Sequence, residues 1–128
     1  MKQRISTEKA PSAPQFLSQG IVSGNTIYVS GQIHNKPDGS MVEGSVKEKV
    51  DQIMQNVSAI LEAADASLDD IVKVVIYVTD MVQMPEINEI YPTYFKEPFP
   101  VREAIGVQAL PLGATIEISV VATKWKTS

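Results

Sequence analysis

The sequence predicts an α+β fold, in which strands joined by turns are combined with two amphipathic helices. The patterns follow one another in the order β-β-β-α-β-α-β-β, which lacks the regular β-α-β repetition of a doubly wound fold. A chain of 128 residues that is 44% hydrophobic is long enough to bury one core. We therefore expect a single domain over residues 1–128.

The strands are predicted from runs rich in β-branched and aromatic residues. These runs cover residues 21–22, 26–33, 71–79, 101–107 and 115–123, and a further short strand is plausible over residues 3–6. The turn signal Ser23-Gly24-Asn25 separates the first two runs and indicates a hairpin.

The helices are predicted from apolar residues spaced three and four apart. The first helix starts with a capping box formed by Ser45 and Glu48. Its apolar stripe consists of Val46, Val50, Ile53, Met54, Val57, Ile60, Leu61 and Ala64. The second helix starts near Pro85 and carries the stripe Ile87, Ile90, Tyr91, Tyr94 and Phe95. Pro92 cannot donate to the carbonyl of Asn88, so we expect a kink there.

The run at residues 71–79 is apolar on both faces. Alternation places Val72, Val74, Ile76 and Val78 on one face, and Ile71, Val75 and Tyr77 on the other. Two helices can cover only one side of a sheet, so the second apolar face needs another layer. Another copy of the chain is the economical source of that layer, and we predict a homo-oligomer.

The last two runs are predicted to form a hairpin around the turn signal at residues 111–113. If Gln108 pairs with Thr115, Arg102 and Glu117 lie on the same face, about 13 Å apart. A direct ion pair is not expected over that distance, but a small carboxylate ligand fits between the two residues.

Arg102 has small residues, Ala104 and Gly106, beside it on its own strand face. One interpretation is a cation at the bottom of a pocket left by missing side chains. The alternative is that Arg102 and Glu117 are ordinary exposed strand residues.

The pair Ser30-Gly31 interrupts an otherwise regular strand. A glycine there is typical of a bulge, or of a place where backbone or ligand approaches closely, and Ser30 adds a hydroxyl. A purely structural role is the competing interpretation.

Composition narrows the class of protein. The formal charge of −4 disfavours nucleic acid as the main partner. The absence of cysteine excludes disulfides, thiolate nucleophiles and cysteine-based zinc sites. The single histidine, His34, lies in a turn-rich stretch, where we expect a structural role. With no signal peptide and no apolar run long enough to cross a membrane, the expected location is cytoplasmic.

Several stretches together resemble the Rid family of imine deaminases, also called the YjgF or endoribonuclease L-PSP family. They are "TEKAP" at 7–11, "VSGQI" at 29–33, "NVSAILEAADASLDDIVKVVIYVTDM" at 56–81, "INEIYPTYF" at 87–95, "PVREA" at 100–104 and "LPLGATIEISVVA" at 110–122. The resemblance covers nearly the whole chain. It implies a chorismate-mutase-like fold with a mixed β-sheet and two helices on one face. It also implies a homotrimer around a central barrel, with ligand clefts between subunits.

The resemblance also implies a set of site residues. The family arginine that holds the substrate carboxylate falls on Arg102, for which a planar guanidinium is suited. The family glutamate falls on Glu117, and the family serine, glycine and asparagine fall on Ser30, Gly31 and Asn88.

Two positions depart from the family pattern. Leu17 stands where a tyrosine is common, and Ala104 stands where a cysteine is common. Neither change touches the carboxylate clamp. Leu17 makes the cleft wall more apolar, and Ala104 opens space on the strand of Arg102. Together they favour substrates with longer aliphatic side chains.

The implied reaction is hydrolysis of a 2-enamine or 2-imine from amino-acid metabolism to a 2-oxo acid and ammonia, with no metal and no cofactor. Arg102 and Glu117 are the expected catalytic residues, and Ser30, Gly31, Asn88, Leu17 and Ala104 are expected to bind substrate. Two alternatives remain open. One is a non-catalytic module that binds 2-oxo or amino acids, and the other is a ribonuclease or translation inhibitor, which would require a basic groove.

Overall fold

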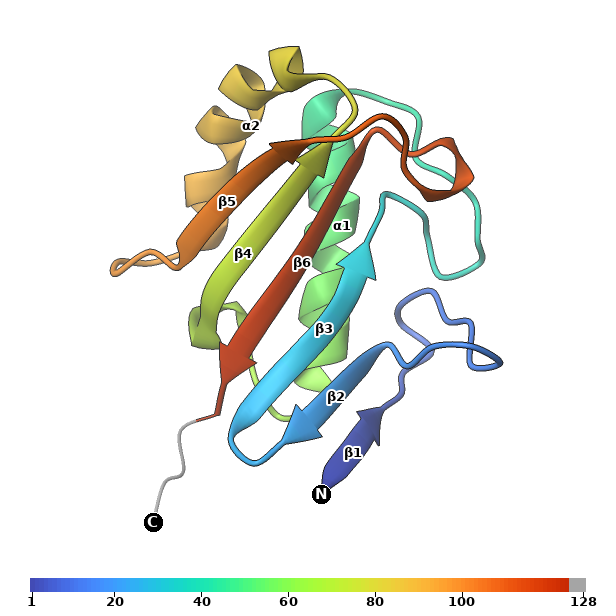
Figure 1. The fold of residues 1–128 in the computed structure, drawn as a ribbon, viewed down its shortest axis with the longest axis vertical. Helices are drawn as coiled ribbons and strands as arrows, with labels where there is room; N and C mark the ends of the chain where they lie inside the picture. Colours follow the sequence, from blue (N-terminus) through green and yellow to red (C-terminus); the bar gives the residue numbers. More distant parts are fainter. Residues whose placement is uncertain (125–128) are drawn as a thin grey trace.

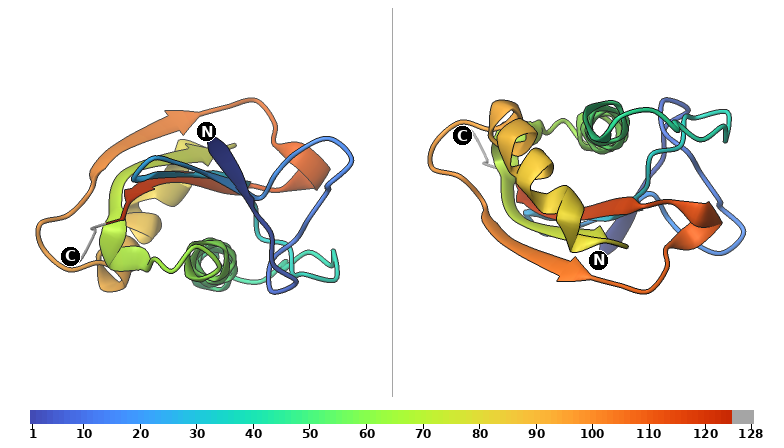
Figure 2. Two further views of the ribbon diagram at one scale, coloured as in Figure 1. Left: turned by 90° about the horizontal axis from the view of Figure 1, so that it is seen from below. Right: turned by 90° about the horizontal axis from the view of Figure 1, so that it is seen from above.

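The computed structural model describes residues 1–124 and has one six-stranded sheet with two helices (Figure 1). The strands are β1 (Lys2–Ile5), β2 (Gly20–Ser23), β3 (Thr26–Gln32), β4 (Ile71–Val78), β5 (Val101–Gly106) and β6 (Ile116–Thr123). The helices are α1 (Val46–Glu62) and α2 (Met84–Ile90). Both helices lie on the same side of the sheet, as Figure 2 shows. The predicted α+β class, element order and one-sided helix layer are confirmed.

The sheet order is β1-β2-β3-β6-β4-β5, so β4 lies between the last two strands. It pairs antiparallel with β6 and parallel with β5, which makes the sheet mixed. The predicted hairpin between the last two strands is therefore wrong. Helix α2 connects β4 to β5, and such a crossover allows two neighbouring strands to run parallel. The open side of β4 is then taken by β6.

At the start of β4 the side chains do not alternate strictly between the two faces of the sheet. The pairing register shifts between Ile71 and Lys73, which is a β-bulge. As a result Ile71 is buried in the core, whereas Val72 is 44% exposed. The sequence pattern placed Val72 on the face of Val74 and Ile71 on the other face, which is the reverse of the structure. The extra residue of a bulge reverses the alternation for the residues before it.

Both helices start where predicted, but α2 is shorter than its predicted stripe, which ran to Phe95. The Ser45 hydroxyl accepts from the Glu48 N–H at 3.1 Å, and the Glu48 carboxylate accepts from the Ser45 N–H at 3.0 Å, which completes the capping box of α1. Helix α2 ends before Pro92, and the chain continues as a tighter 3₁₀ turn over Tyr91–Tyr94. This change of helix type accommodates the proline.

His34 joins two segments that are distant in the sequence. Its side chain is fully buried, with Nδ1 donating to the Val42 carbonyl at 2.8 Å and Nε2 accepting from the Thr115 N–H at 3.0 Å. The predicted structural role is confirmed. Burial lowers the pKa of His34, and the Lys49 ammonium acts in the same direction, while the hydrogen bond to Val42 and the Glu43 carboxylate oppose it. The neutral ring is the form that can accept from Thr115.

We expect the protein to lose stability in mild acid because of His34. Its folded-state pKa lies below the ordinary value of 6.5. The stabilisation is therefore complete above about pH 6.5 and is lost as the pH falls through the folded-state pKa. The free energy of unfolding measured with urea should decrease by about 1 kcal/mol from pH 7.5 to 5.5. His34→Gln should reduce that difference. Equal wild-type stability at both pH values contradicts this role.

Candidate functional site

Arg102 is exposed on β5 but is held in place by α2 and the turn after it. Its Nη1 donates to Oδ1 of Asn88 at 2.8 Å, and its Cζ lies 5.1 Å from the centroid of the Tyr91 ring. Asn88 and Tyr91 are three residues apart and so share one helix face. Ala104 lies on the same strand face as Arg102 and packs against the core. One edge of the guanidinium is thus engaged, and its other donors can bind an anion in a two-point contact.

Glu117 lies against Gly31 at the end of β3. A Cβ on Gly31 would stand 2.9 Å from Cδ of Glu117, which is closer than real Cβ contacts allow. The β3–β6 register also shifts between Val29 and Gln32, so Gly31 sits in a bulge. The predicted bulge is confirmed, and the group that approaches Gly31 closely is a side-chain carboxylate rather than the expected backbone or ligand. Burial raises the pKa of Glu117.

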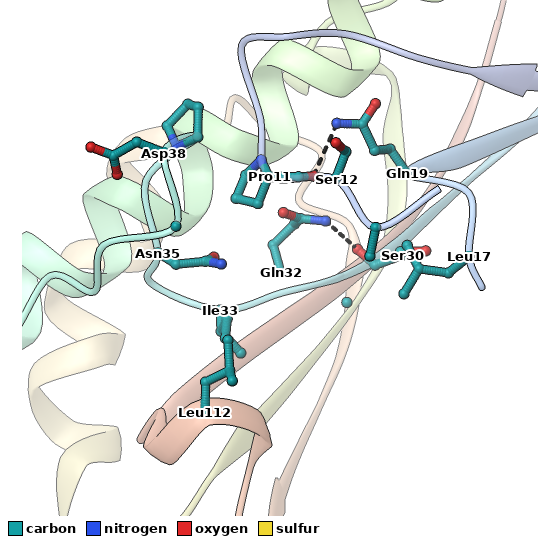
Figure 3. Close-up of a pocket in the computed structure, with 14 residues that line it drawn as sticks. Pro11, Ser12, Leu17, Gln19, Ser30, Gln32, Ile33, Asn35, Asp38 and Leu112 are labelled. Carbon is teal, nitrogen blue, oxygen red and sulfur yellow. Dashed lines mark hydrogen bonds between the residues drawn. The ribbon is translucent and has the colours of Figure 1, made fainter. Parts of the chain in front are cut away.

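Ser30 and Gly31 line a pocket of about 420 Å³ that Leu17 also lines (Figure 3). The Ser30 hydroxyl donates to the Ser18 carbonyl at 2.6 Å, and the Ser30 N–H donates to the Gln19 carbonyl at 2.9 Å. These bonds attach the loop that carries Leu17 to β3. Because its proton is engaged, the Ser30 hydroxyl meets a ligand as an acceptor.

The two groups of residues lie on opposite faces of the sheet. Arg102 is paired across neighbouring strands with Val74, a core residue that faces the helices, whereas Glu117 is paired with Tyr77. Paired residues point to the same face of a sheet. Residues 74 and 77 are an odd number of positions apart, so their side chains point to opposite faces. The prediction that Arg102 and Glu117 share a face is therefore wrong, because β4 lies between their strands. Within one chain the two residues do not meet.

Two residues of the candidate site, Tyr91 beside Arg102 and Leu112 in the pocket, were not predicted from the sequence as site residues. Tyr91 was assigned to the core stripe of the second helix, although its spacing from Asn88 is the signal that could have placed both residues under Arg102. Leu112 was assigned to a turn. It lines the pocket beside Gly31, and nothing in the local sequence indicates that contact.

Residues 1–124 contain neither a metal-binding cluster nor a membrane-spanning helix. In this part of the chain no three His, Cys, Asp or Glu side chains gather as metal ligands do. None of its helices has the length and apolar character needed to cross a membrane.

These features define a class of small α+β proteins with a one-sided helix layer and a pinned arginine suited to carboxylates. The chain belongs to the family described as Endoribonuclease L-PSP, whose model matches residues 7–124. The resemblance to the Rid or YjgF family is thereby confirmed.

Individual relatives agree with this assignment. The human protein named 2-iminobutanoate/2-iminopropanoate deaminase is 44% identical over 119 residues, which are 92% of this chain and 87% of that protein. The crystal structure of yeast Mmf1 superposes with a TM-score of 0.94 at 40% identity and covers 98% of this chain and 100% of that one. The structure of E. coli TdcF with bound serine has a TM-score of 0.89 at 32% identity, over 96% and 99% of the two chains. The yeast relative is named as mitochondrial, so the cytoplasmic location stays a prediction.

Gly31→Ala is expected to move the Glu117 carboxylate into solvent, because the new methyl group occupies the place of that carboxylate. The pKa of Glu117 should then fall toward the ordinary glutamate value. NMR titration of the Glu117 carboxyl carbon measures this shift. Gly106→Ala is the matched control, since its Cβ would meet the flexible Met81 side chain at 3.3 Å. An unchanged pKa in Gly31→Ala contradicts the close packing of the two residues.

Proposed function

We propose that this protein hydrolyses 2-imino and 2-enamino acids to 2-oxo acids and ammonia, as a single-domain enzyme that uses neither metal nor cofactor. The observation that carries the proposal is the geometry of Arg102, whose guanidinium is held by Asn88 and Tyr91 while part of its donor set stays free. The name of the human relative, 2-iminobutanoate/2-iminopropanoate deaminase, supports the same reaction.

The proposed chemistry needs few groups. Arg102 binds the substrate carboxylate in a two-point ionic contact, which fixes the adjacent iminium carbon. Glu117, in its ionised form, takes a proton from a water molecule that attacks this carbon, and a carbinolamine forms. The carbinolamine nitrogen then takes up a proton, the carbon–nitrogen bond breaks while the hydroxyl group loses its proton, and ammonia leaves a ketone behind. The raised pKa of Glu117 makes it a stronger base than an exposed carboxylate.

We propose that this site forms between copies of the chain in a homotrimer with a central barrel. The support is twofold. Arg102 and Glu117 face opposite sides of their own sheet, so a second copy is needed to bring them together. The face without helices also exposes apolar side chains, among them Tyr28 at 51%, Val101 at 67% and Ile105 at 39% exposure.

A second candidate function is binding of amino or 2-oxo acids without turnover. The TdcF structure with bound serine favours it, as does the replacement of the family tyrosine by Leu17. The same Arg102 clamp would serve both functions. A ribonuclease is disfavoured, because the single histidine is fully buried and both of its ring nitrogens are engaged.

We expect Arg102→Ala to lower kcat/KM for imine hydrolysis about a hundredfold or more, since two charge-assisted hydrogen bonds worth on the order of 3 kcal/mol are lost. Arg102→Lys should also be poor, because an ammonium cannot form the planar two-point contact. An amino-acid oxidase generates the imine, and semicarbazide traps what the protein does not hydrolyse. Arg4→Ala, an exposed arginine on β1, is the control. Full activity in folded Arg102→Ala excludes the clamp, and binding without turnover in the wild type favours the second function.

Mixing two inactive variants tests whether the site is shared. Arg102→Ala and Glu117→Gln should each be inactive as pure proteins. In randomly mixed trimers, about one quarter of the intersubunit sites contain both native residues, and activity should return in that proportion. No recovery in verified mixed trimers contradicts a shared site. Sedimentation of the wild type as a monomer of 14.0 kDa contradicts the assembly itself.

A further inference from the structure

Leu112 has a backbone conformation that leucine rarely adopts. It lies in the 3₁₀ turn Pro111–Gly113 with φ 57° and ψ 25°, in the left-handed region. That region crowds the Cβ of a branched or bulky residue and is normally occupied by glycine, asparagine or aspartate. The only other non-glycine residue with positive φ in residues 1–124 is Asp65, a residue type that tolerates it. Leucine is therefore the unexpected residue type at such a position.

The packing of the chain does not account for this leucine. Its side chain is 77% exposed, so it contributes little to the core. A residue that is both strained and exposed is not explained by stability, and such residues concentrate at sites that contact ligands. The function of the Leu112 side chain therefore has to lie in a contact with another molecule.

The surroundings of Leu112 indicate which contact that is. Leu112 and Leu17 line the same pocket of about 420 Å³, together with Ser30 and Gly31. Figure 3 shows the two leucines reaching this pocket from two separate segments, the loop before β2 and the turn before β6. Glu117 lies against Gly31. Two apolar side chains thus line the same pocket as the glycine against which the proposed base packs.

We propose that Leu112 and Leu17 form the substrate side-chain subsite and select 2-imino acids with branched or long aliphatic side chains. This assignment rests on the proposed function, and Leu112 determines specificity without taking part in the chemistry. Each methylene that is buried in such a subsite raises kcat/KM about fourfold. Between two leucines, a polar substrate side chain gains less from burial than an aliphatic side chain of the same size.

Leu112→Asn tests the subsite, because asparagine has a similar size, tolerates the left-handed conformation and is polar. The measurement is kcat/KM for the imine of leucine relative to the imine of alanine, both generated with an amino-acid oxidase and trapped with semicarbazide. We expect the wild type to prefer the leucine imine, and Leu112→Asn to lower the ratio about tenfold. Val82→Asn is the matched control, since Val82 is 76% exposed and does not line the pocket, and its ratio should equal that of the wild type.

A second variant tests the strain itself. Leu112→Gly should unfold at the same temperature as the wild type or a higher one, because glycine adopts this conformation without strain. A lower melting temperature shows that the leucine supports the fold or the assembly, and overturns the subsite.

The remaining outcomes separate this assignment from the proposed function. An unchanged imine ratio in an active Leu112→Asn overturns the subsite and leaves the imine hydrolase intact. Equal loss of both substrates together with dissociation of the assembly identifies Leu112 as an intersubunit contact and also overturns the subsite. A wild type that hydrolyses neither imine overturns the proposed function, and the subsite with it.

Discussion

The position of β4 between two strands of opposite direction is the constraint on which the rest of the molecule depends. The crossover through α2 places β5 parallel to β4 on one side, and β6 closes the other side antiparallel. This pairing fixes which residues are level with one another across the three strands. It therefore determines that Arg102 points toward the helices and that Glu117 points away from them.

The same arrangement explains why the helices matter for a residue that lies outside the core. Helix α2 both connects β4 to β5 and supplies Asn88, and the turn that follows supplies Tyr91. The segment that makes β5 parallel thus also orients the arginine of that strand. Pro92 ends the helix just after Tyr91 and is compatible with this geometry, since the chain continues as a 3₁₀ turn.

The pocket side of the molecule depends on backbone irregularity more than on regular pairing. A bulge in β3 places Gly31 where only a residue without a side chain leaves room for the Glu117 carboxylate. Ser30 attaches the loop of Leu17 to the same strand, and a left-handed turn presents Leu112. These local features therefore line one pocket, and the Glu117 carboxylate, whose pKa is raised by burial, packs against the glycine of that pocket.

The sequence by itself determined the elements and the family. Apolar spacing, the capping box and turn residues are local signals, and they predicted every strand and both helices. The resemblance to the family supplied the remaining candidate site residues, such as Asn88 and Leu17. The tertiary structure alone decided the strand order, the bulge that buries Ile71 rather than Val72, and the opposite faces of Arg102 and Glu117. The physical reason is range. The periodicity of one segment shows which of its side chains point to each face of the sheet. Which strand pairs with each edge of that strand is decided by burial and connection geometry across the whole chain.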